Sequence, residues 1–251
     1  MTADTVLNKM QKLSWQEKYK SKVLSSDDAL NVVKSGDKIV IQPGCAAPME
    51  LIRALVRKKD NLMGVELYHI LIVGNLPYLE EGMEKHFEHK AFFIGGNARK
   101  AVNEGRANFI PIFLSEVTLL FKKGIIVPDV ALINVSPPDD HGYCSYGIDV
   151  GNIKTPTEKS KFVIAQINHE MPRGLGNSFI HLNKNLKFYF PNKSPYSECQ
   201  IPEDISHVQG IFNTFTSQNL SYKTQIHKTY KNEYPWPLLN YYKSLEGTAH
   251  K

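Results

Sequence analysis

Short apolar runs alternate with amphipathic stretches along this chain, and the alternation constrains its fold more than any other feature. Residues 38–42 and 65–73 are rich in β-branched and aliphatic side chains, which is typical of buried strands. Between them, apolar side chains recur at helical spacing, namely Met49, Leu51, Ile52, Leu55 and Val56. A strand, a helix and a second strand in this order predict a parallel pair joined by a right-handed crossover.

The same alternation continues further along the chain. We expect helices over residues 13–34, 98–103 and 115–122, and strands over residues 91–94, 108–114, 130–135 and 162–167. Strands that alternate with helices predict an α/β domain with a largely parallel sheet flanked by helices. Ligands bind beyond the carboxyl ends of the strands in such sheets, so the loops after the strands are the candidate functional segments.

The last part of the chain has a different character. Beyond residue 204 the apolar periodicity fades, polar residues and tyrosines dominate, and prolines at positions 235 and 237 break any helix. A segment without a periodic apolar face cannot offset the entropy lost when it becomes ordered. We therefore expect an α/β domain over residues 1–204 and an irregular, poorly ordered tail over residues 205–251.

The composition suits a globular domain and excludes some partners. Hydrophobic residues make up 42% of the 251 residues, and charged residues 22%. The net charge is +5, but the basic runs at residues 57–59 and 122–123 follow apolar helical patterns, where cations stabilise helix C-termini. We therefore expect no nucleic-acid partner. No apolar run reaches the length of a membrane span, so we expect no membrane partner either.

The three cysteines, Cys45, Cys144 and Cys199, form no CxxC pair. Their odd number argues against a disulfide framework, and their spacing argues against a zinc site, so we expect no metal. This usage suits the reducing cytosol. Residues 1–22 contain no apolar core of signal-peptide length. We therefore expect a cytoplasmic location.

The first candidate loop is the small-residue segment Gly44, Cys45, Ala46, Ala47 and Pro48. Small side chains let a ligand approach the backbone, and the helix start that follows favours negative charge. Its backbone N–H groups are candidates for part of an oxyanion hole. The alternative is an ordinary tight turn between a strand and a helix. The loop is not a P-loop, because no Gly-Lys-Ser/Thr follows.

The second candidate loop contains Asn97 and Arg99, directly after Gly95 and Gly96. Arg99 is a candidate partner for a phosphate or a carboxylate. Asn97 has an alternative structural role as the N-cap of the helix that follows.

The third candidate loop, residues 136–147, follows the most hydrophobic predicted strand and carries His141, Gly142 and Tyr143. His141 and Cys144 lie close in sequence, so a Cys–His nucleophile pair is conceivable. Proximity in sequence does not make a catalytic geometry, and we favour a shaped binding loop.

The fourth candidate loop holds Asn168, Met171, Pro172 and Arg173 after another buried strand. Glu170 lies among them and is a possible base or nucleophile. A solvated loop carboxylate is the commoner role for such a residue.

These segments together resemble the acetyl-CoA hydrolase/transferase family, which includes 4-hydroxybutyrate and butyrate:acetate CoA-transferases. The matching pieces are SGDKIVIQPGCAAPMELIRAL, GGNARKAVNEGRANFIPIFLSE, PDVALINVSPPDDHGYCSYG and FVIAQINHEMPR, within residues 10–200. The resemblance implies two related α/β domains around a cleft, an acyl-CoA and a small carboxylic acid as substrates, and no permanently bound cofactor. It also implies a homo-oligomer for the complete protein.

The resemblance further implies a ping-pong reaction in which a glutamate carboxylate attacks the thioester. In the family that glutamate belongs to the carboxy-terminal domain, which no stretch of this sequence matches. We therefore expect no catalytic residue in this chain, and a substrate- or CoA-binding role for the fourteen residues named in the four loops. The sequence departs from the family pattern at Tyr146 and Asp149, which implies an altered acyl specificity, and at Gly174 and Leu175.

Three interpretations remain open at this point. The chain is a truncated and inactive enzyme fragment, or one subunit of a two-chain transferase with the glutamate supplied in trans. The third interpretation is a non-catalytic protein that binds CoA or another protein. The polar tail favours the first. The complementary carboxy-terminal domain or subunit is the partner that the first two interpretations require.

Overall fold

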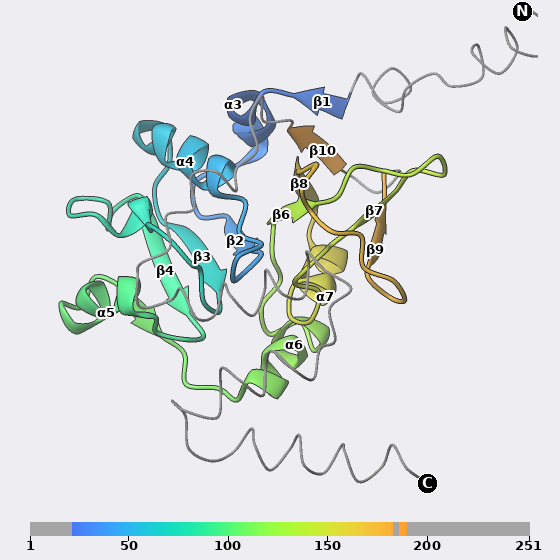
Figure 1. Cartoon of the computed structure of the whole chain (residues 1–251). Helices are drawn as coiled ribbons and strands as arrows, with labels where there is room; N and C mark the ends of the chain where they lie inside the picture. Colours follow the sequence, from blue (N-terminus) through green and yellow to red (C-terminus); the bar gives the residue numbers. More distant parts are fainter. Residues whose placement is uncertain (1–21, 183–185, 190–251) are drawn as a thin grey trace, which may run out of the picture. The chain divides into compact units, whose positions relative to one another are not determined.

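The computed structural model describes residues 22–182 and 186–189 of the chain (Figure 1). Its central element is an eight-stranded sheet in which every neighbouring pair of strands is parallel. The strands follow the spatial order β1 (Val23–Leu24), β10 (Leu186–Tyr189), β8 (Phe162–Ile167), β6 (Val130–Val135), β2 (Lys38–Ile41), β3 (Val65–His69), β4 (Phe87–Ala91) and β5 (Asn108–Phe109). The expected α/β domain with a parallel sheet is therefore confirmed.

Helices cover both faces of this sheet (Figure 1). The face with α3 (Ser26–Ala29) and α4 (Met49–Arg57) also packs against α5 (Gly96–Asn103). The opposite face packs against α6 (Leu114–Lys122) and the segment that leads into α7 (Lys154–Lys159). Two separate layers of apolar side chains result, one on each face, as the predicted alternation of strands and helices requires.

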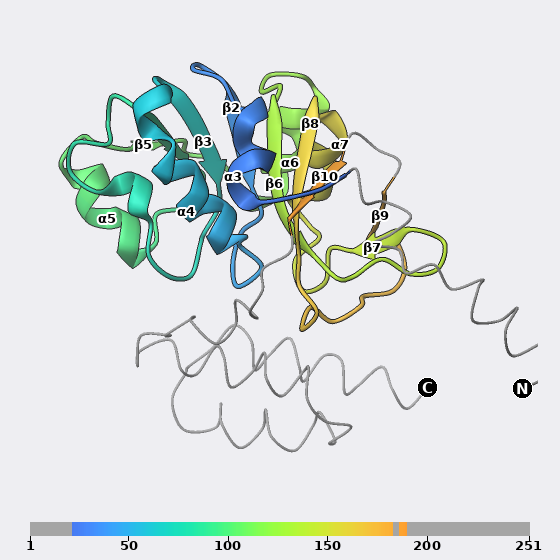
Figure 2. The same cartoon turned by 90° about the horizontal axis from the view of Figure 1, so that it is seen from above.

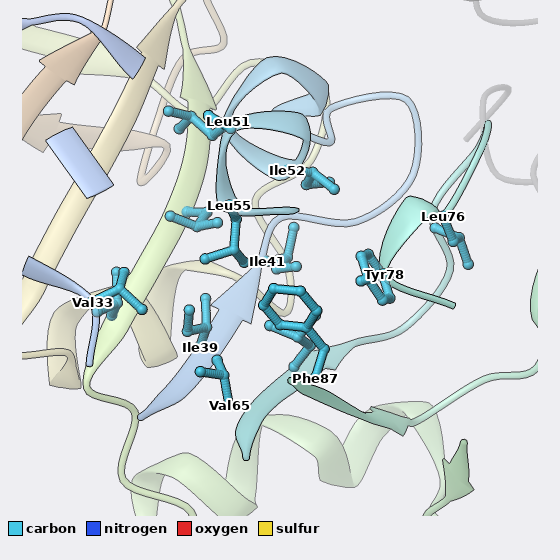
Figure 3. Packing of buried hydrophobic residues seen from close by; sticks show 14 of the residues in the cluster. Val33, Ile39, Ile41, Leu51, Ile52, Leu55, Val65, Leu76, Tyr78 and Phe87 are labelled. Atoms are coloured by element: carbon cyan, nitrogen blue, oxygen red, sulfur yellow. The ribbon is translucent and has the colours of Figure 1, made fainter. Parts of the chain in front are cut away.

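Strand β2 shows how the pleat divides the core between these layers. Ile39 and Ile41 lie in the α4 layer, and Val40 lies in the α6 layer. Figure 3 shows Ile39 and Ile41 near Leu51 and Leu55 of α4, and the side chains of both leucines are fully buried. Each such leucine stabilises the fold by about 1.5–3 kcal/mol relative to an exposed side chain. Burial on both faces explains why the central strands are continuous apolar runs.

The start of the described chain corrects one expectation. Residues 13–34 were expected to be helical, but Val23 and Leu24 form strand β1, and residues 13–21 lie outside the described part. Helix α3 does begin where capping side chains cluster, since the Asp28 N–H donates to Ser25 Oγ at 3.0 Å. The helix is short, and a 3-10 turn, Leu30–Val32, follows it.

Two strands were placed wrongly or overextended. Strand β4 covers Phe87–Ala91, not residues 91–94, and its side chains alternate between buried and exposed. Such half-polar strands lack the apolar run that identifies a buried strand. Strand β5 covers only Asn108–Phe109, and Pro111, which has no N–H to donate, follows soon after.

Some elements gave no usable signal in the sequence. A two-stranded antiparallel sheet joins β7 (Tyr143–Ser145) to β9 (Phe179–His181), and neither strand was expected. The predicted boundary at residue 204 and the predicted tail lie outside the described residues. Within the described part, no helix is long and apolar enough to cross a membrane.

Candidate functional site

Three of the four candidate loops leave neighbouring strands at the same edge of the sheet. Strands β2, β6 and β8 are adjacent and parallel, so the loops that follow them start side by side. Figure 2 shows these loops at one end of the sheet, opposite the turn that leads into β2. This edge is where α/β sheets bind ligands.

Gly44 is held like an extra residue of the sheet. Its N–H donates to Leu71 O at 2.5 Å, and its carbonyl accepts from the Val73 N–H at 3.3 Å. Its φ of +65° lies in the left-handed region, which favours glycine. The loop then turns into α4, whose N-cap is Pro48.

The N–H groups of Ala46 and Ala47 donate to no acceptor within the described residues. Cys45 lies between them and Gly44 and is half-buried. The segment is thus a tight turn between a strand and a helix, and both Ala46 and Ala47 are buried. The interpretation of this loop as part of an oxyanion hole stays a prediction.

Gln42 organises the site, although its place in the sequence indicates only the end of a strand. Its side chain is fully buried, and its Nε2 donates to Tyr146 O at 3.0 Å and to Asp149 O at 2.8 Å. Its Oε1 accepts from the Asn134 N–H at 2.6 Å. One amide therefore holds β2, β6 and the segment after β7 together. A polar residue at the end of an otherwise apolar run was the only signal for it in the sequence.

Asp149 lies directly beside the first loop. Its Oδ2 is 3.7 Å from the point that a Cβ on Gly44 would occupy. Burial raises the pKa of its carboxyl to about 6. Tyr146, the other departure from the family pattern, is 1% exposed and packs in the α6 layer. The Asp149 side chain is the one that lies against Gly44 in the small-residue loop, within the described residues.

Asn97 joins the second loop to the segment after β3. Its Nδ2 donates to Ile72 O at 2.9 Å and to Gly74 O at 2.7 Å. The alternative role as an N-cap is wrong, because Gly95 occupies that position and α5 begins at the next residue. Since Gly44 pairs with the same segment, Asn97 and the first loop lie on either side of it. The side chain of Arg99 is exposed.

The third loop is shaped by Asp139. Its Oδ1 accepts from the N–H groups of His141 and Tyr143, at 3.0 and 2.9 Å. Arg173 of the fourth loop donates to Asp139 Oδ2 at 2.5 Å and to Tyr143 O at 3.0 Å. Gly142 completes the turn with a φ of +84°. Arg173 thus connects the third loop to the fourth, a role for which the sequence carries no signal.

The Cys–His nucleophile pair is excluded by burial. Cys144 is 0% exposed, and burial raises the pKa of its thiol to about 12. A thiol with that pKa is not a thiolate at neutral pH, so it is a poor nucleophile. His141 is exposed, and its carbonyl is hydrogen-bonded to His181 Nε2 at 2.9 Å.

The side chain of Met171 in the fourth loop packs closely against Gly147. A Cβ on Gly147 would lie 2.1 Å from Met171 Sδ, and the φ of Gly147 is +67°. Asn168 is buried, and its Oδ1 accepts from the Glu170 N–H at 3.0 Å. Pro172 is exposed, as is Glu170, which agrees with the interpretation of Glu170 as a solvated carboxylate.

The four predicted loops therefore form one continuous series of contacts. Asn97 bonds the segment after β3, Gly44 bonds the same segment, and Asp149 lies against Gly44. The third loop then meets the fourth through Gly147 and Arg173. The series combines a small-residue turn, a desolvated carboxylate and an exposed arginine at the carboxyl edge of a parallel sheet.

Comparison with known proteins gives a family to which this arrangement corresponds. The acetyl-CoA hydrolase/transferase N-terminal domain matches residues 6–213. A 4-hydroxybutyrate coenzyme A transferase of Clostridium kluyveri is 41% identical over 191 residues, which are 76% of this chain and 44% of that protein. A succinyl-CoA:acetate/propanoyl-CoA:succinate CoA transferase of Fasciola hepatica is 36% identical over 78% of this chain and 41% of its own length.

Solved structures agree with this result. The 4-hydroxybutyrate CoA-transferase of Porphyromonas gingivalis superposes with a TM-score of 0.60 and 28% identity, over 72% of this chain and 42% of that one. RipA from Yersinia pestis shares the fold, with a TM-score of 0.66 at 20% identity, over 70% of this chain and 43% of its own. The chain thus spans less than half the length of each of these four proteins.

Proposed function

The chain belongs to the acetyl-CoA hydrolase/transferase family, and on this basis we propose that it is the amino-terminal half of an acyl-CoA:carboxylate CoA-transferase. Its substrates would be a CoA thioester and a small carboxylic acid, the classes that the names of its relatives carry. The observation that carries the proposal is the continuous series of four loops at the carboxyl edge of the sheet. We assign these loops one wall of the substrate site.

Within this wall, the small-residue loop would bind the thioester oxygen. The N–H groups of Ala46 and Ala47 find no acceptor within the described residues, and they directly precede a helix N-terminus. Donors that are already aligned stabilise the negative charge that develops on a thioester oxygen during attack. Arg99, exposed at the start of α5, would interact with an anionic part of CoA.

The nucleophile in this proposal comes from outside the described residues. Glu50 is held by Arg57 at 3.0 Å and by Arg53 at 3.7 Å, on the outer surface of α4. Glu170 is exposed, and Glu116 lies in the first turn of α6. A glutamate supplied by the complementary domain or subunit would attack the thioester carbon, and CoA would leave as the thiolate. The CoA thiolate would then attack the glutamyl carbonyl of the resulting acyl-glutamyl anhydride, which releases the first carboxylate and leaves a glutamyl-CoA thioester. A second carboxylate would repeat these steps in reverse, so that it leaves as the new CoA thioester and the glutamate is regenerated.

Two measurements on the purified chain test this function. Isothermal titration calorimetry should detect binding of CoA and acetyl-CoA. Treatment with acetyl-CoA followed by hydroxylamine should leave every glutamate of the chain unmodified by mass spectrometry. A hydroxamate on Glu50, Glu116 or Glu170 would contradict the assignment of the nucleophile.

A third measurement decides between the interpretations of the chain. The carboxy-terminal half of the Clostridium kluyveri relative, made separately, should restore exchange of labelled acetate into acetyl-CoA when it is mixed with this chain. A mixture in which the catalytic glutamate of that half is changed to glutamine is the matched control. Tight CoA binding without any restored exchange would favour the non-catalytic CoA-binding interpretation.

A further inference from the structure

The segment after β3 is closed on itself by a contact between two buried side chains. It starts after His69, the last residue of β3, and ends before Tyr78, which lies in the 3-10 turn η4 (Pro77–Leu79). His69 Nε2 and the Tyr78 hydroxyl are 2.5 Å apart, and both side chains are buried. Residues 70–77 therefore form a loop whose two ends are tied together, which we call the 70–77 loop.

The middle of the 70–77 loop holds both the first and the second candidate loop. Gly44 of the first loop forms backbone hydrogen bonds on both sides of Ile72, as in a parallel pair of strands. Asn97 of the second loop donates from Nδ2 to the carbonyls of Ile72 and Gly74, at 2.9 and 2.7 Å. A movement of the 70–77 loop would therefore displace two parts of the candidate site at once.

A second buried histidine supports the closing contact. The ring of His89 in β4 stacks on the ring of His69, with 4.2 Å between their centroids. Tyr78 stands edge-on to both rings, at centroid distances of 6.0 Å from His69 and 5.7 Å from His89. His89 is 0% exposed, and neither of its ring nitrogens has a hydrogen-bond partner. Tyr78 thus covers a pair of stacked imidazole rings.

No charged side chain of the described residues is placed to balance a proton on these rings. The charged residues of β3 and β4 lie on the opposite face of the sheet, namely Glu66, Glu88 and Lys90. Those of the neighbouring helices pair with one another at the surface, namely Glu50, Arg53 and Arg57 of α4, and Lys100 and Glu104 around α5. Arg106 donates to the carbonyl of Leu79 in η4, but it pairs with Glu84 and Glu104. The closed loop therefore requires both rings to be neutral.

We propose that Tyr78 is a positioning residue of the candidate site, which keeps the 70–77 loop closed over neutral His69 and His89, and that acid opens this loop before it unfolds the domain. Opening removes Tyr78 from the two rings, so water can reach them and a charge is tolerated there. Opening is therefore coupled to the uptake of protons. The closure of the loop stands on the geometry alone, whereas its consequence for ligand binding rests on the proposed function.

The size of the acid effect follows from the burial of the rings. Burial lowers the pKa of His89 from 6.5 to about 4, and burial together with the neighbouring His89 lowers the pKa of His69. The open loop, in which the rings regain their ordinary pKa, binds more protons than the closed loop below pH 6.5. Opening is thus favoured as the pH falls from 6.5 toward 4. Between pH 7.5 and 5.0, His89 alone should raise the equilibrium constant for opening about thirtyfold.

Hydrogen exchange of the full chain, followed by mass spectrometry and corrected for the intrinsic rate at each pH, tests the closing contact. The amides of Gly44 and Val73 report on the loop, because they donate to Leu71 O and Gly44 O. Tyr78→Phe keeps the ring but leaves His69 Nε2 without its partner, so it should lower their protection about tenfold at pH 7.5. The amides of β6 and β8 should keep their protection.

Tyr68→Phe is the matched control for the lost hydroxyl. Tyr68 is the residue before His69, and its hydroxyl donates to Glu66 at 2.7 Å on the opposite face of the sheet. This variant should exchange like the wild-type chain at Gly44 and Val73. Equal exchange in Tyr78→Phe and Tyr68→Phe, or an equal loss of protection in all strands of Tyr78→Phe, would overturn the inference.

The same measurement at pH 5.0 tests the role of the histidines. The wild-type chain should lose protection at Gly44 and Val73 about thirtyfold relative to pH 7.5, and His89→Phe should lose much less. His89→Gln is a second variant that cannot be protonated, should His89→Phe not fold. Protection at these two amides that is the same at both pH values in the wild-type chain would refute the acid opening.

Calorimetric titration with CoA at pH 7.5 separates this inference from the proposed function. CoA should bind more weakly to Tyr78→Phe than to Tyr68→Phe, because the open loop no longer holds Gly44 and Asn97 in place. Equal affinities of the two variants would contradict the positioning role of Tyr78. Absence of CoA binding to every variant, with the expected exchange pattern, would overturn the proposed function and leave the closure of the loop in place.

Discussion

His89→Phe should make the fold markedly less sensitive to acid. In the wild-type chain the ring of His89 is 0% exposed and stacks on His69 with 4.2 Å between the ring centroids. Neither of its ring nitrogens has a partner in the described structure. His69 in turn hydrogen-bonds to the hydroxyl of Tyr78 at 2.5 Å. Protonation would place a charge in this buried stack, so the fold requires a neutral ring.

The size of the stability loss in acid follows from the shifted pKa of His89. Burial lowers the pKa of His89 from 6.5 to about 4. Between these values the unfolded chain binds more protons than the folded chain, so stability decreases as the pH falls from 6.5 toward 4. The full difference corresponds to about 3 kcal/mol. His69, whose pKa is also lowered by burial and by the neighbouring histidine, adds to the loss over the same range.

Urea unfolding followed by circular dichroism at pH 7.5, 6.0 and 5.0 measures this loss. Phenylalanine keeps the ring and the stack but cannot be protonated, so the stability of His89→Phe should change less between these pH values than that of the wild-type chain. His169→Asn, at an exposed histidine, should behave like the wild type. An acid dependence of His89→Phe equal to that of the wild-type chain would refute the reasoning.

Three further changes test other parts of the site. Asp149→Asn should raise the free energy of unfolding at pH 7.5 by about 1–3 kcal/mol, because the raised pKa of about 6 means that the ionised carboxylate destabilises the fold above that pH; urea titration at pH 7.5 should show no gain over wild type if burial is not the cause. Gly147→Ala should lower the free energy of unfolding by about 2 kcal/mol or more, because the added Cβ would clash with Met171 and the φ of Gly147 is positive. An unchanged midpoint of thermal unfolding would show that this close contact is absent. Gln42→Leu should lower the free energy of unfolding by about 2–4 kcal/mol, since it leaves the Asn134 N–H and two backbone carbonyls without their partner. The specific measurement is hydrogen exchange, in which the backbone amide of Asn134 should lose its protection.

The sequence was sufficient to place a strand where the local apolar pattern agrees with the burial of that strand. Strands β6 and β8 occur at the predicted residues 130–135 and 162–167, because strands buried on both faces are continuous apolar runs. Strand β4 was misplaced because Glu88 and Lys90 interrupt its apolar side chains. Strand β7 was missed because a strand of three residues carries too little periodicity to be identified.

The sequence predicted that the four loops gather, but it did not predict the contacts that join them. The four loops were identified because each follows a strand, and the rule for parallel sheets places them at one edge. The side chain of Gln42 reaches a residue 107 positions away, and no local pattern carries such a contact. Arg173 was expected to bind substrate, and that prediction still awaits a test. Its bonds to Asp139 and Tyr143 depend on a fold that brings two distant loops together.

The pairing of Gly44 with the segment after β3 also bears on how tightly this loop can hold a ligand. A flexible loop loses conformational entropy when it closes on its ligand, and that loss weakens the affinity. Here the turn is already bonded to Leu71 and Val73 as a short continuation of the sheet, so most of its ordering accompanies folding. A ligand that meets the backbone of this loop therefore binds a surface that is preorganised, and the chain need not be ordered a second time.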